Sequence, residues 1–240
     1  MKKPEIKVFC DFDGTIAVED IGNLFYREFG NPEVCDDFVQ KWREGKISSI
    51  ECLSGECKTI QNLTIEKAYN FIDQQNIDET FIDFVKFCKE NNLELIVLSD
   101  GLDIYIKRIF EKYNLDIKFY SNSIRLNEDG TAEMIFPYTD TSCLRCANCK
   151  RNHIINNSSD DDITIYIGDG YSDRCPVEYV DYIFAKKDLL RHCEINRISY
   201  FPFDNFKSVR EIIEKIISKK RIKKRNTAIL KRRELYLLEP

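Results

Sequence analysis

The sequence lacks any long hydrophobic segment. Its 240 residues contain no uninterrupted run of about 18 apolar residues, the length that a membrane-spanning helix needs. The first residues, MKKPEIKVFC, pass from lysines directly into a short apolar run, without the longer apolar segment typical of a secretion signal. We therefore expect a cytoplasmic protein without a membrane partner. Its 43% of apolar residues is enough for one sizeable core.

The sequence also lacks internal repeats and the signature of any known nucleic-acid-binding module. Its formal charge of −5 is unevenly distributed, because residues 218–240 carry nine Lys or Arg against two Glu. This tail is therefore +7 and the rest of the chain is −12. We do not expect an acidic body to bind nucleic acid in general. The basic tail could be a fraying, solvated helix or a contact for an acidic partner or RNA.

Ten cysteines are present, but the chain is too long for a small disulfide-stapled domain, so we expect most of them to be reduced thiols. One cluster has the spacing of metal ligands; its members are Cys143, Cys146, Cys149 and His153. Three thiolates and an imidazole can form a tetrahedral zinc site, and Cys175 or Cys193 could replace the histidine. The alternative is a reduced, cysteine-rich loop or a labile disulfide.

Four short apolar runs, rich in Ile and Val, recur with helix-like segments between them; they are residues 6–10, 93–98, 163–167 and 182–185. This spacing predicts an α/β, Rossmann-like fold with a parallel sheet flanked by helices. Three of the runs end in acidic or hydroxyl residues plus glycine, in the segments DFDGT, SDG and GDG. Because ligands of open α/β sheets bind beyond the carboxyl ends of the strands, we expect the functional site there.

The first two of these segments are separated by about eighty residues, far more than a crossover connection needs. Four amphipathic helices are expected in the interval, at residues 20–30, 33–44, 48–60 and 64–75. We therefore predict a helical cap at residues 16–79, inserted into a core formed by residues 1–15 and 80–217. Its aromatic residues, such as Phe25, Phe38 and Trp42, are interpreted as packing within the cap.

A second excursion follows the SDG segment. Two β-like runs flank Asp129 and Gly130, and an Asp-Gly pair between such runs is typical of a hairpin turn. The sequence therefore predicts a β-hairpin that leaves the core. The tail at residues 218–240 would follow the last core helix, which is expected at residues 205–217.

Asp11 and Asp13 follow the first strand two positions apart. On an extended segment, side chains at such spacing can project to the same side. Two like charges so close repel each other unless a cation lies between them. Mg²⁺ prefers oxygen ligands, and Asp169 at another strand end can complete its protein ligands. A phosphate-bearing substrate suits such a site, since Mg²⁺ is commonly shared with substrate phosphates.

Taken in order, DFDGT, LSDG, the lysine of CKRNHI and GDGYSD resemble the four motifs of the phosphatases of the haloacid dehalogenase superfamily. The resemblance covers nearly all of residues 6–217. It implies that Asp11 is the nucleophile and forms an aspartyl-phosphate intermediate. It also implies that Asp13 is the general acid for the leaving alcohol and the general base for the hydrolytic water.

The resemblance assigns the other motif residues as well. Ser99 would donate a hydrogen bond to a phosphoryl oxygen, and Lys150 would neutralise charge on the nucleophile and the transferring group. Asp169 would bind Mg²⁺ together with Asp11 and the backbone carbonyl of Asp13. Asp173 would support the metal or Lys150 from nearby.

The expected cap, the hairpin and the form GDGYSD resemble the phosphoserine phosphatase branch of the superfamily. The segments CLRCANCK and FAKKDLLRHC resemble the methionine-salvage phosphatases, which act on 2-hydroxy-3-keto-5-methylthiopentenyl-1-phosphate. Asp20 agrees with that group, because phosphoserine phosphatases usually carry a glutamate at this offset. We therefore expect a small phosphorylated metabolite as substrate.

Several alternatives stay open. Related phosphatases commonly have two glycines after Ser99, whereas this chain has Asp100 and Gly101, so Asp100 either adds a carboxylate near the phosphate pocket or points away from it. We place Asp20, Asp100 and Gly101 among the substrate-binding residues. The extra acids could suit a cationic substrate such as phosphocholine or phosphoethanolamine, and phosphoserine is a further candidate. The alternative from another class is a zinc-stabilised binding or regulatory protein. The sequence does not indicate an oligomeric state.

Overall fold

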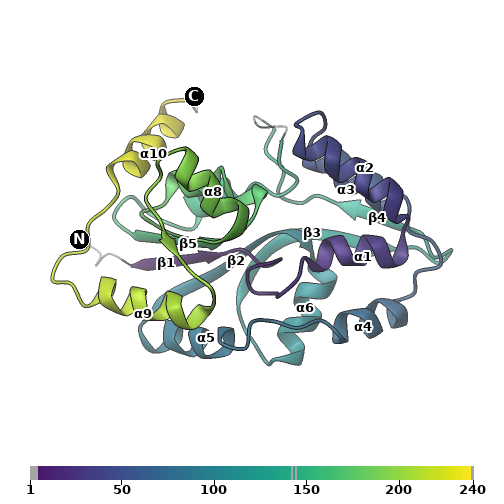
Figure 1. Ribbon diagram of the computed structural model, residues 1–240, viewed down its shortest axis with the longest axis horizontal. Coiled ribbons are helices and arrows are strands. Elements are labelled where there is room, and N and C mark those ends of the chain that lie inside the picture. Colours follow the sequence, from purple (N-terminus) through teal and green to yellow (C-terminus); the bar gives the residue numbers. More distant parts are fainter. Residues whose placement is uncertain (1–4, 142, 144, 239–240) are drawn as a thin grey trace.

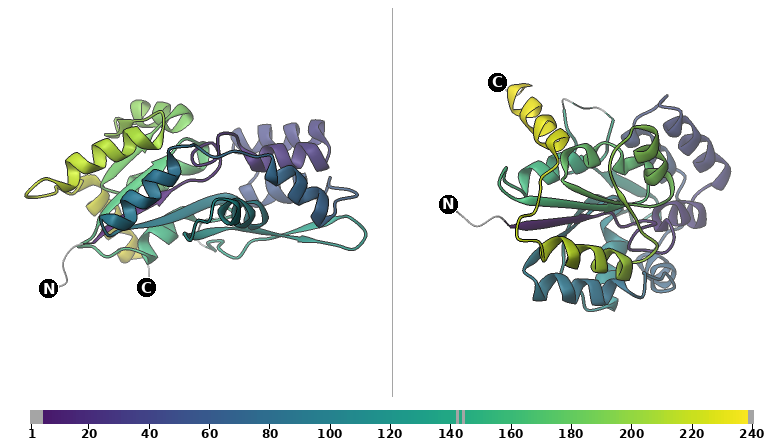
Figure 2. Two further views of the ribbon diagram at one scale, coloured as in Figure 1. Left: turned by 90° about the horizontal axis from the view of Figure 1, so that it is seen from below. Right: turned by 60° about the vertical axis from the view of Figure 1, so that its left-hand side comes forward.

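A computed structural model describes residues 5–141, 143 and 145–238; residues 1–4 of the expected core and 239–240 of the expected tail lie outside this range. A single seven-stranded sheet forms the centre of the molecule, and helices lie on both of its faces (Figures 1 and 2). None of the helices in the described part of the chain is long and apolar enough to cross a membrane.

The strands follow one another across the sheet in the order β4-β3-β2-β1-β5-β6-β7. Their bounds are β1 (Ile6–Cys10), β2 (Leu93–Leu102), β3 (Lys118–Leu126), β4 (Ala132–Ile135), β5 (Ile163–Gly168), β6 (Tyr182–Ala185) and β7 (Phe201–Pro202). All neighbours pair in parallel except β3 and β4, which are antiparallel. The predicted parallel α/β sheet is therefore confirmed, with β1 in the middle.

Ten α-helices and two short 3₁₀ helices are described. The α-helices are α1 (Ile21–Phe29), α2 (Pro32–Arg43), α3 (Ser49–Cys57), α4 (Ile65–Asp73), α5 (Phe81–Glu90), α6 (Asp103–Lys112), α7 (Lys150–Asn156), α8 (Lys187–Ile195), α9 (Phe206–Ile217) and α10 (Asn226–Leu238). The 3₁₀ helices are η1 (Tyr171–Asp173) and η2 (Pro176–Tyr179). The four helices expected between the first two motif segments are thus present as α1 to α4.

The two faces of the sheet bury separate apolar clusters, because neighbouring residues of a strand point to opposite faces. On β1, Val8 and Cys10 pack with the apolar residues of α5, α6 and α9, whereas Phe9 packs with those of α7 and α8. Figure 1 shows the same division, with α5, α6 and α9 below the sheet and α8 above it. Burial on both faces explains why the strands read as continuous apolar runs.

Each of the helices α1 to α4 begins at a side chain that accepts a hydrogen bond from the first turn; the four caps are Asp20, Asn31, Ser48 and Thr64. Such N-caps satisfy amide groups that have no partner inside the helix. The last of these helices is also fastened to the core, because Arg108 of α6 donates two hydrogen bonds, of 2.7 and 2.6 Å, to the carboxylate of Asp73 in α4.

The hairpin predicted around Asp129 and Gly130 is confirmed as β3 and β4. The hairpin leaves the core as predicted, because residues 123–126 of β3 pair with β4 beyond residues 118–122, the part of β3 that pairs in parallel with β2 (Figure 2). The hairpin supports the helices of the predicted cap: Leu63 N donates to Gly130 O at 3.0 Å, and the hydroxyl of Tyr26 in α1 lies 3.2 Å from the sulfur of Met134.

The basic tail forms α10 and packs on the body of the protein. Ala228 is 1% exposed and Arg232 is 6% exposed. Arg232 donates to the backbone and hydroxyl oxygens of Ser158 at 3.2 and 2.9 Å. The expectation of a fraying helix surrounded by solvent is therefore wrong for this part of the tail, since two of its residues are buried against the core.

Candidate active site

Three adjacent strands bring the motif residues to one edge of the sheet. Asp11 follows β1, Asp169 follows β5, and Ser99 lies near the carboxyl end of β2. Because β2, β1 and β5 are parallel neighbours, these residues meet at the same edge. These residues therefore gather at the edge of the sheet where the site was predicted.

A tight turn carries the chain away from β1 directly after Asp11. Ile16 N and Ala17 N both donate to the carbonyl of Phe12, at 2.9 Å each. Within this turn Gly14 has φ +70°, and a Cβ at this position would lie 2.5 Å from the Oδ2 atom of Asp169. Glycine is therefore required here for two reasons, a left-handed backbone and the close approach of the neighbouring carboxylate.

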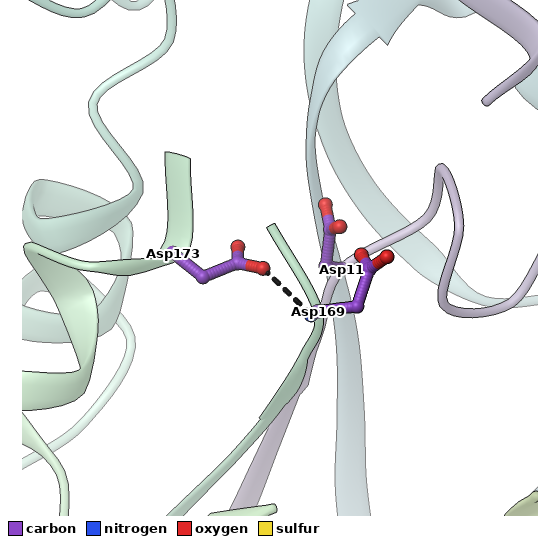
Figure 3. A group of neighbouring side chains, drawn as sticks. All are labelled: Asp11, Asp169 and Asp173. Carbon is purple, nitrogen blue, oxygen red and sulfur yellow. Dashed lines mark hydrogen bonds between the residues drawn. The ribbon is translucent and has the colours of Figure 1, made fainter. Parts of the chain in front are cut away.

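Asp11, Asp169 and Asp173 form an acidic cluster (Figure 3). Each offers a carboxylate oxygen within 4.8 Å of the others, and all three residues are buried. Burial, and next the charge of Asp173, raises the pKa of Asp11 well above its usual range. A hard divalent cation would relieve this repulsion, and the oxygen donors suit Mg²⁺.

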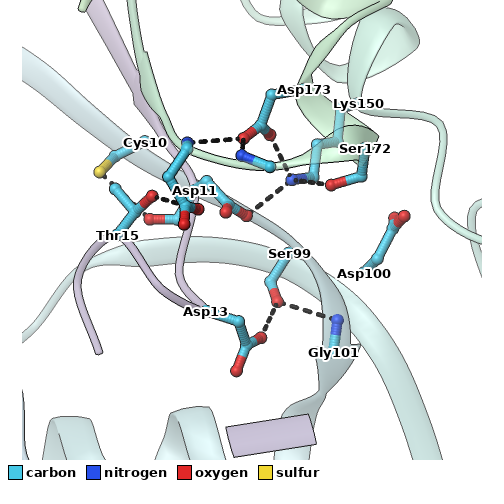
Figure 4. Close-up of polar contacts among 12 residues, drawn as sticks. Cys10, Asp11, Asp13, Thr15, Ser99, Asp100, Gly101, Lys150, Ser172 and Asp173 are labelled. Carbon is cyan, nitrogen blue, oxygen red and sulfur yellow. Dashed lines mark hydrogen bonds and ion pairs between the residues drawn. The ribbon is translucent and has the colours of Figure 1, made fainter. Parts of the chain in front are cut away.

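Lys150, the first residue of α7, lies against this cluster and is 2% exposed. Its Nζ donates to Asp11 Oδ1 at 2.6 Å, to Asp173 Oδ1 at 2.8 Å and to the hydroxyl of Ser172 at 3.0 Å (Figure 4). Burial alone would lower the pKa of Lys150, but the charges of Asp11 and Asp173 raise it well above the ordinary value. The lysine is thus held as a cation beside Asp11.

Asp173 organises the loop that follows β5. Its Oδ2 accepts from Asp169 N at 3.0 Å and Gly170 N at 2.9 Å, and its Oδ1 accepts from the hydroxyl of Tyr166 at 2.6 Å as well as from Lys150. The residue is completely buried. The structure therefore places Asp173 beside Lys150, as the motif resemblance implies, and shows that it also fixes the backbone of Asp169.

Asp13 does not point to the same side as Asp11, which was the expectation for an extended segment. The turn at Phe12 rotates Asp13 away from the acidic cluster, and its carboxylate lies near Ser99 (Figure 4). Burial, and next the charge of Asp20, raises the pKa of Asp13 to about 7. The carboxylate of Asp13 is therefore not part of the acidic cluster. This agrees with the resemblance, which implies that Asp13 binds the metal through its backbone carbonyl.

The predicted substrate-binding residues have different positions. Asp20 caps α1, because its Oδ1 accepts from Asn23 N at 2.8 Å, while its side chain is exposed. Gly101 N donates to the Ser99 hydroxyl at 2.9 Å. Asp100 points away from Asp13 (Figure 4), and burial raises its pKa to about 6. Of its two oxygens, Oδ1 is buried and accepts no hydrogen bond from the described residues.

The residues of the predicted zinc site, Cys143, Cys146, Cys149 and His153, are not arranged as metal ligands. Within the described part of the chain, the acidic cluster is the only group of three or more such side chains close enough to share an ion. His153 Nε2 is 2.6 Å from the Oδ1 atom of Asn148, and its ring stacks on Tyr120 with centroids 4.0 Å apart. Because Nε2 must donate to this oxygen, it is not available to bind zinc.

Several residues of the site were missed from the sequence. Thr15 donates to Asp169 Oδ1 at 3.0 Å, and Lys187 Nζ lies 2.9 Å from Asp169 Oδ2. Thr15 and Ser172 lie inside the motifs DFDGT and GDGYSD, so their place in these motifs could have identified them as residues of the site. Tyr105 gave no such signal, because it occupies an apolar position of α6. Lys187 lies in the segment FAKKDLLRHC, but the resemblance of that segment assigned no role to the lysine.

The site is almost closed to solvent. Asp11 is 5% exposed, Asp169 is 7% exposed and Ser99 is fully buried. Trp42 of α2 contacts Tyr171 of the loop after β5, which joins the predicted cap to the core at this point. Trp42 was interpreted as packing within the cap; the structure shows that it reaches beyond the cap to the core.

An aspartate after a central parallel strand, a buried lysine on that aspartate and two further carboxylates at the same edge form the site that the resemblance to the phosphatases of the haloacid dehalogenase superfamily implies. Comparison with known proteins agrees. A family model described as Putative Phosphatase matches residues 6–217. The chain belongs to this family.

Curated relatives include enzymes named 2-hydroxy-3-keto-5-methylthiopentenyl-1-phosphate phosphatase. The protein from Bacillus mycoides (strain KBAB4) is 31% identical over 207 residues, which are 85% of this chain and 94% of the relative. That from Bacillus cereus (strain ATCC 14579) is 31% identical over 221 residues, 90% of this chain and 99% of the relative. A Schizosaccharomyces pombe protein named Pdp3-interacting factor 1 is 26% identical over 234 residues, 90% of this chain and 97% of the relative.

Among solved structures, a phosphoaspartyl intermediate analogue of phosphoserine phosphatase superposes with a TM-score of 0.65 at 22% identity, over 89% of this chain and 99% of the other. A hydrolase of the same superfamily from Salmonella enterica serovar Typhi superposes with a TM-score of 0.70 at 18% identity, over 88% of this chain and 72% of the other. These structures confirm the fold that the motif resemblance implies.

Proposed function

We propose that the protein is a Mg²⁺-dependent phosphomonoesterase in which Asp11 is the nucleophile. The observation that carries this proposal is the contact of Lys150 Nζ with both Asp11 Oδ1 and Asp173 Oδ1 at the edge of the sheet. A buried cation beside a nucleophilic carboxylate is suited to stabilise the charge that a phosphoryl group brings into a site closed to water.

In the first step, an oxygen of Asp11 forms a bond to phosphorus while the bond from phosphorus to the ester oxygen breaks. The electron pair of that bond goes to the leaving oxygen, which takes a proton from Asp13. In the second step, Asp13 takes a proton from water as the water oxygen attacks the aspartyl phosphate, and Asp11 and inorganic phosphate are released. Throughout, Lys150 and Ser99 bind the oxygens of the transferring group.

The acidic cluster fits a magnesium ion, because it supplies buried oxygen donors whose mutual repulsion a cation would relieve. Asp11 and Asp169 would hold the ion together with the backbone carbonyl of Asp13, and Asp173 would keep the backbone of Asp169 in place. When bound, Mg²⁺ offsets the negative charge of the phosphate and the carboxylates. The described residues of the cysteine cluster do not form a zinc site, so the proposed cofactor is Mg²⁺ alone.

For the substrate, we propose a small enol phosphate of the methionine-salvage type. The support is the 31% identity, over most of both chains, to the Bacillus phosphatases named for that substrate. Phosphoserine, phosphocholine and phosphoethanolamine are the competing substrates. We also propose that residues 16–79 act as a cap over the catalytic core formed by residues 1–15 and 80–217, and that the cap selects the substrate.

We place the enzyme in the cytoplasm. All ten cysteines are free thiols in the structure, as suits a reducing compartment.

The test is release of inorganic phosphate by the purified protein, with and without Mg²⁺. The panel contains the methylthiopentenyl enol phosphate, phosphoserine, phosphocholine, phosphoethanolamine and sugar phosphates, and Asp11→Asn is assayed in parallel. We expect Mg²⁺-dependent release that the variant lacks, with the highest kcat/KM for the enol phosphate. Substantial release by a folded Asp11→Asn variant would contradict the assignment of the nucleophile. A higher kcat/KM for another ester would replace the proposed substrate.

A further inference from the structure

The carboxylate of Asp13 is surrounded by four hydrogen-bond donors. Its Oδ1 accepts from Ile21 N at 3.0 Å and Gly22 N at 3.4 Å, both in the first turn of α1. Its Oδ2 accepts from the Ser99 hydroxyl at 3.1 Å and the Tyr105 hydroxyl at 2.7 Å. The bond from Tyr105 is the shortest of the four.

The two hydroxyl donors are not equivalent. Ser99 Oγ already accepts from Gly101 N at 2.9 Å, so its single proton is directed at Asp13. If this proton turns to a phosphoryl oxygen, as the proposed function requires, Ser99 no longer donates to Asp13. Tyr105 is then the side chain, among those described here, that still donates to Asp13 Oδ2.

The fold makes room for this phenol. Tyr105 is completely buried, and its ring packs 5.8 Å from that of Phe12, the residue between the two catalytic aspartates. A Cβ at Gly101 would lie 1.5 Å from the Tyr105 hydroxyl and 2.6 Å from Asp13 Oδ2. Glycine at position 101 therefore allows the hydroxyl of Tyr105 to reach the carboxylate of Asp13. The position of Gly101 in the SDG segment did not predict this role.

We propose that Tyr105 is the positioning residue of the general acid: its hydroxyl holds the carboxyl group of Asp13 in place while Ser99 turns to the phosphoryl group of the substrate. Tyr105 acts through Asp13 and does not touch the reacting atoms. The inference rests on the proposed function, because it assigns a task to a residue behind the proposed acid.

The test uses a matched pair of phosphate esters. The leaving group of 4-nitrophenyl phosphate is a stable phenolate that needs no proton, whereas 4-nitrobenzyl phosphate has nearly the same shape and releases an alkoxide that must be protonated. For Tyr105→Phe we expect kcat/KM for the benzyl ester to fall about tenfold and that for the phenyl ester to change less than about twofold. A defect in folding or in phosphate binding would lower both values equally.

Tyr113→Phe, at the carboxyl end of the same helix, is the control and should match the wild type on both esters. Thermal melting establishes that each variant is folded. Equal losses on the two esters, or no loss on either, would overturn the role of Tyr105. The proposed function fails separately, if the wild-type protein releases no phosphate from these two esters or from any ester of the panel above.

Discussion

The indole ring of Trp42 meets the ring of Tyr171 edge to face, with centroids 4.9 Å apart and an interplanar angle of 65°. Trp42 lies in α2 and Tyr171 in the loop that runs from Asp169 to Asp173, so one aromatic contact joins the predicted cap to the loop that carries two carboxylates of the site. The indole nitrogen of Trp42 also donates to the hydroxyl of Ser49 at 3.0 Å, which fixes the ring within the cap.

The first prediction concerns this contact. Trp42→Ala removes the ring that α2 places against Tyr171, and the closed arrangement of cap and core should lose stability. We expect KM for the preferred phosphate ester to rise about fivefold, with a smaller change in kcat. Steady-state kinetics measure both constants. Val34→Ala, at an exposed position of the same helix, is the control, and a KM equal to the wild-type value in Trp42→Ala would contradict the prediction.

The second prediction compares one chemical change at two aspartates. Asp173 accepts from Lys150, Tyr166 and two backbone amides, so Asp173→Asn should destabilise the metal-free protein by about 3 kcal/mol, the usual cost of breaking a buried charge pair. Asp11 is a buried carboxylate with a raised pKa, and Lys150 keeps Asp173 as a partner without it. Asp11→Asn should therefore leave the stability of the metal-free protein unchanged or higher.

Urea unfolding in the presence of a chelator measures both differences. Equal destabilisation by the two variants would contradict this account of the cluster. It would mean that the two carboxylates contribute to the fold in the same way.

The third prediction concerns Glu56 of α3, which is 3% exposed and hydrogen bonded to the thiol of Cys52. Burial raises the pKa of Glu56 from 4.5 to about 7. The folded state therefore holds the proton more tightly than the unfolded state, and the stabilisation from this group is lost as the pH rises from 4.5 through 7. Glu56→Gln keeps a neutral, hydrogen-bonding side chain at every pH, so it avoids this loss.

We expect the free energy of unfolding of Glu56→Gln, relative to the wild type, to rise by about 2 kcal/mol between pH 5 and pH 8. Urea unfolding at the two pH values checks the sign and the size. Glu66→Gln, at an exposed position of α4, should show no such dependence. A difference between Glu56→Gln and the wild type that does not vary with pH would show that Glu56 is already ionised in the folded protein.

The fourth prediction concerns the tail helix. Arg232 donates to two oxygens of Ser158 from a buried position, whereas its neighbour Arg233 is exposed. Arg232→Ala should lower the free energy of unfolding by about 2 kcal/mol, because a hydrogen-bonded charged group is removed from a buried site. Arg233→Ala removes the same charge and should change stability little. Equal effects of the two substitutions would mean that α10 contributes through charge alone.

The sequence predicted the parts of the site that follow from strand periodicity and motif order. Apolar runs located β1, β2 and β5, and parallel pairing brought Asp11, Ser99 and Asp169 to one edge. The orientation of Asp13 was not predictable in this way, because it depends on a turn in which Phe12 O accepts hydrogen bonds from three backbone amides. Spacing of two residues places side chains on one side only while the backbone stays extended.

Other features could not be predicted because the same sequence pattern is compatible with two different environments in the folded protein. Tyr105 occupies an apolar position of an amphipathic helix, and nothing in that pattern indicates that its hydroxyl reaches Asp13. The tail has the charge pattern of a solvated helix, but Ala228 and Arg232 on one side of this helix are buried against the rest of the protein. The cysteine spacing suggested zinc, but spacing does not reveal that His153 is already bonded to Asn148.

The pairing of Leu63 with Gly130 and of Tyr26 with Met134 also bears on how the chain folds during synthesis. Helices α1 and α3 leave the ribosome well before β4, the strand that both of them contact. The apolar faces of these helices therefore stay exposed until β4 has been synthesised. Long-range contacts of this kind slow folding. A nascent chain that ends before β3 would expose these faces and would be a natural client for chaperones.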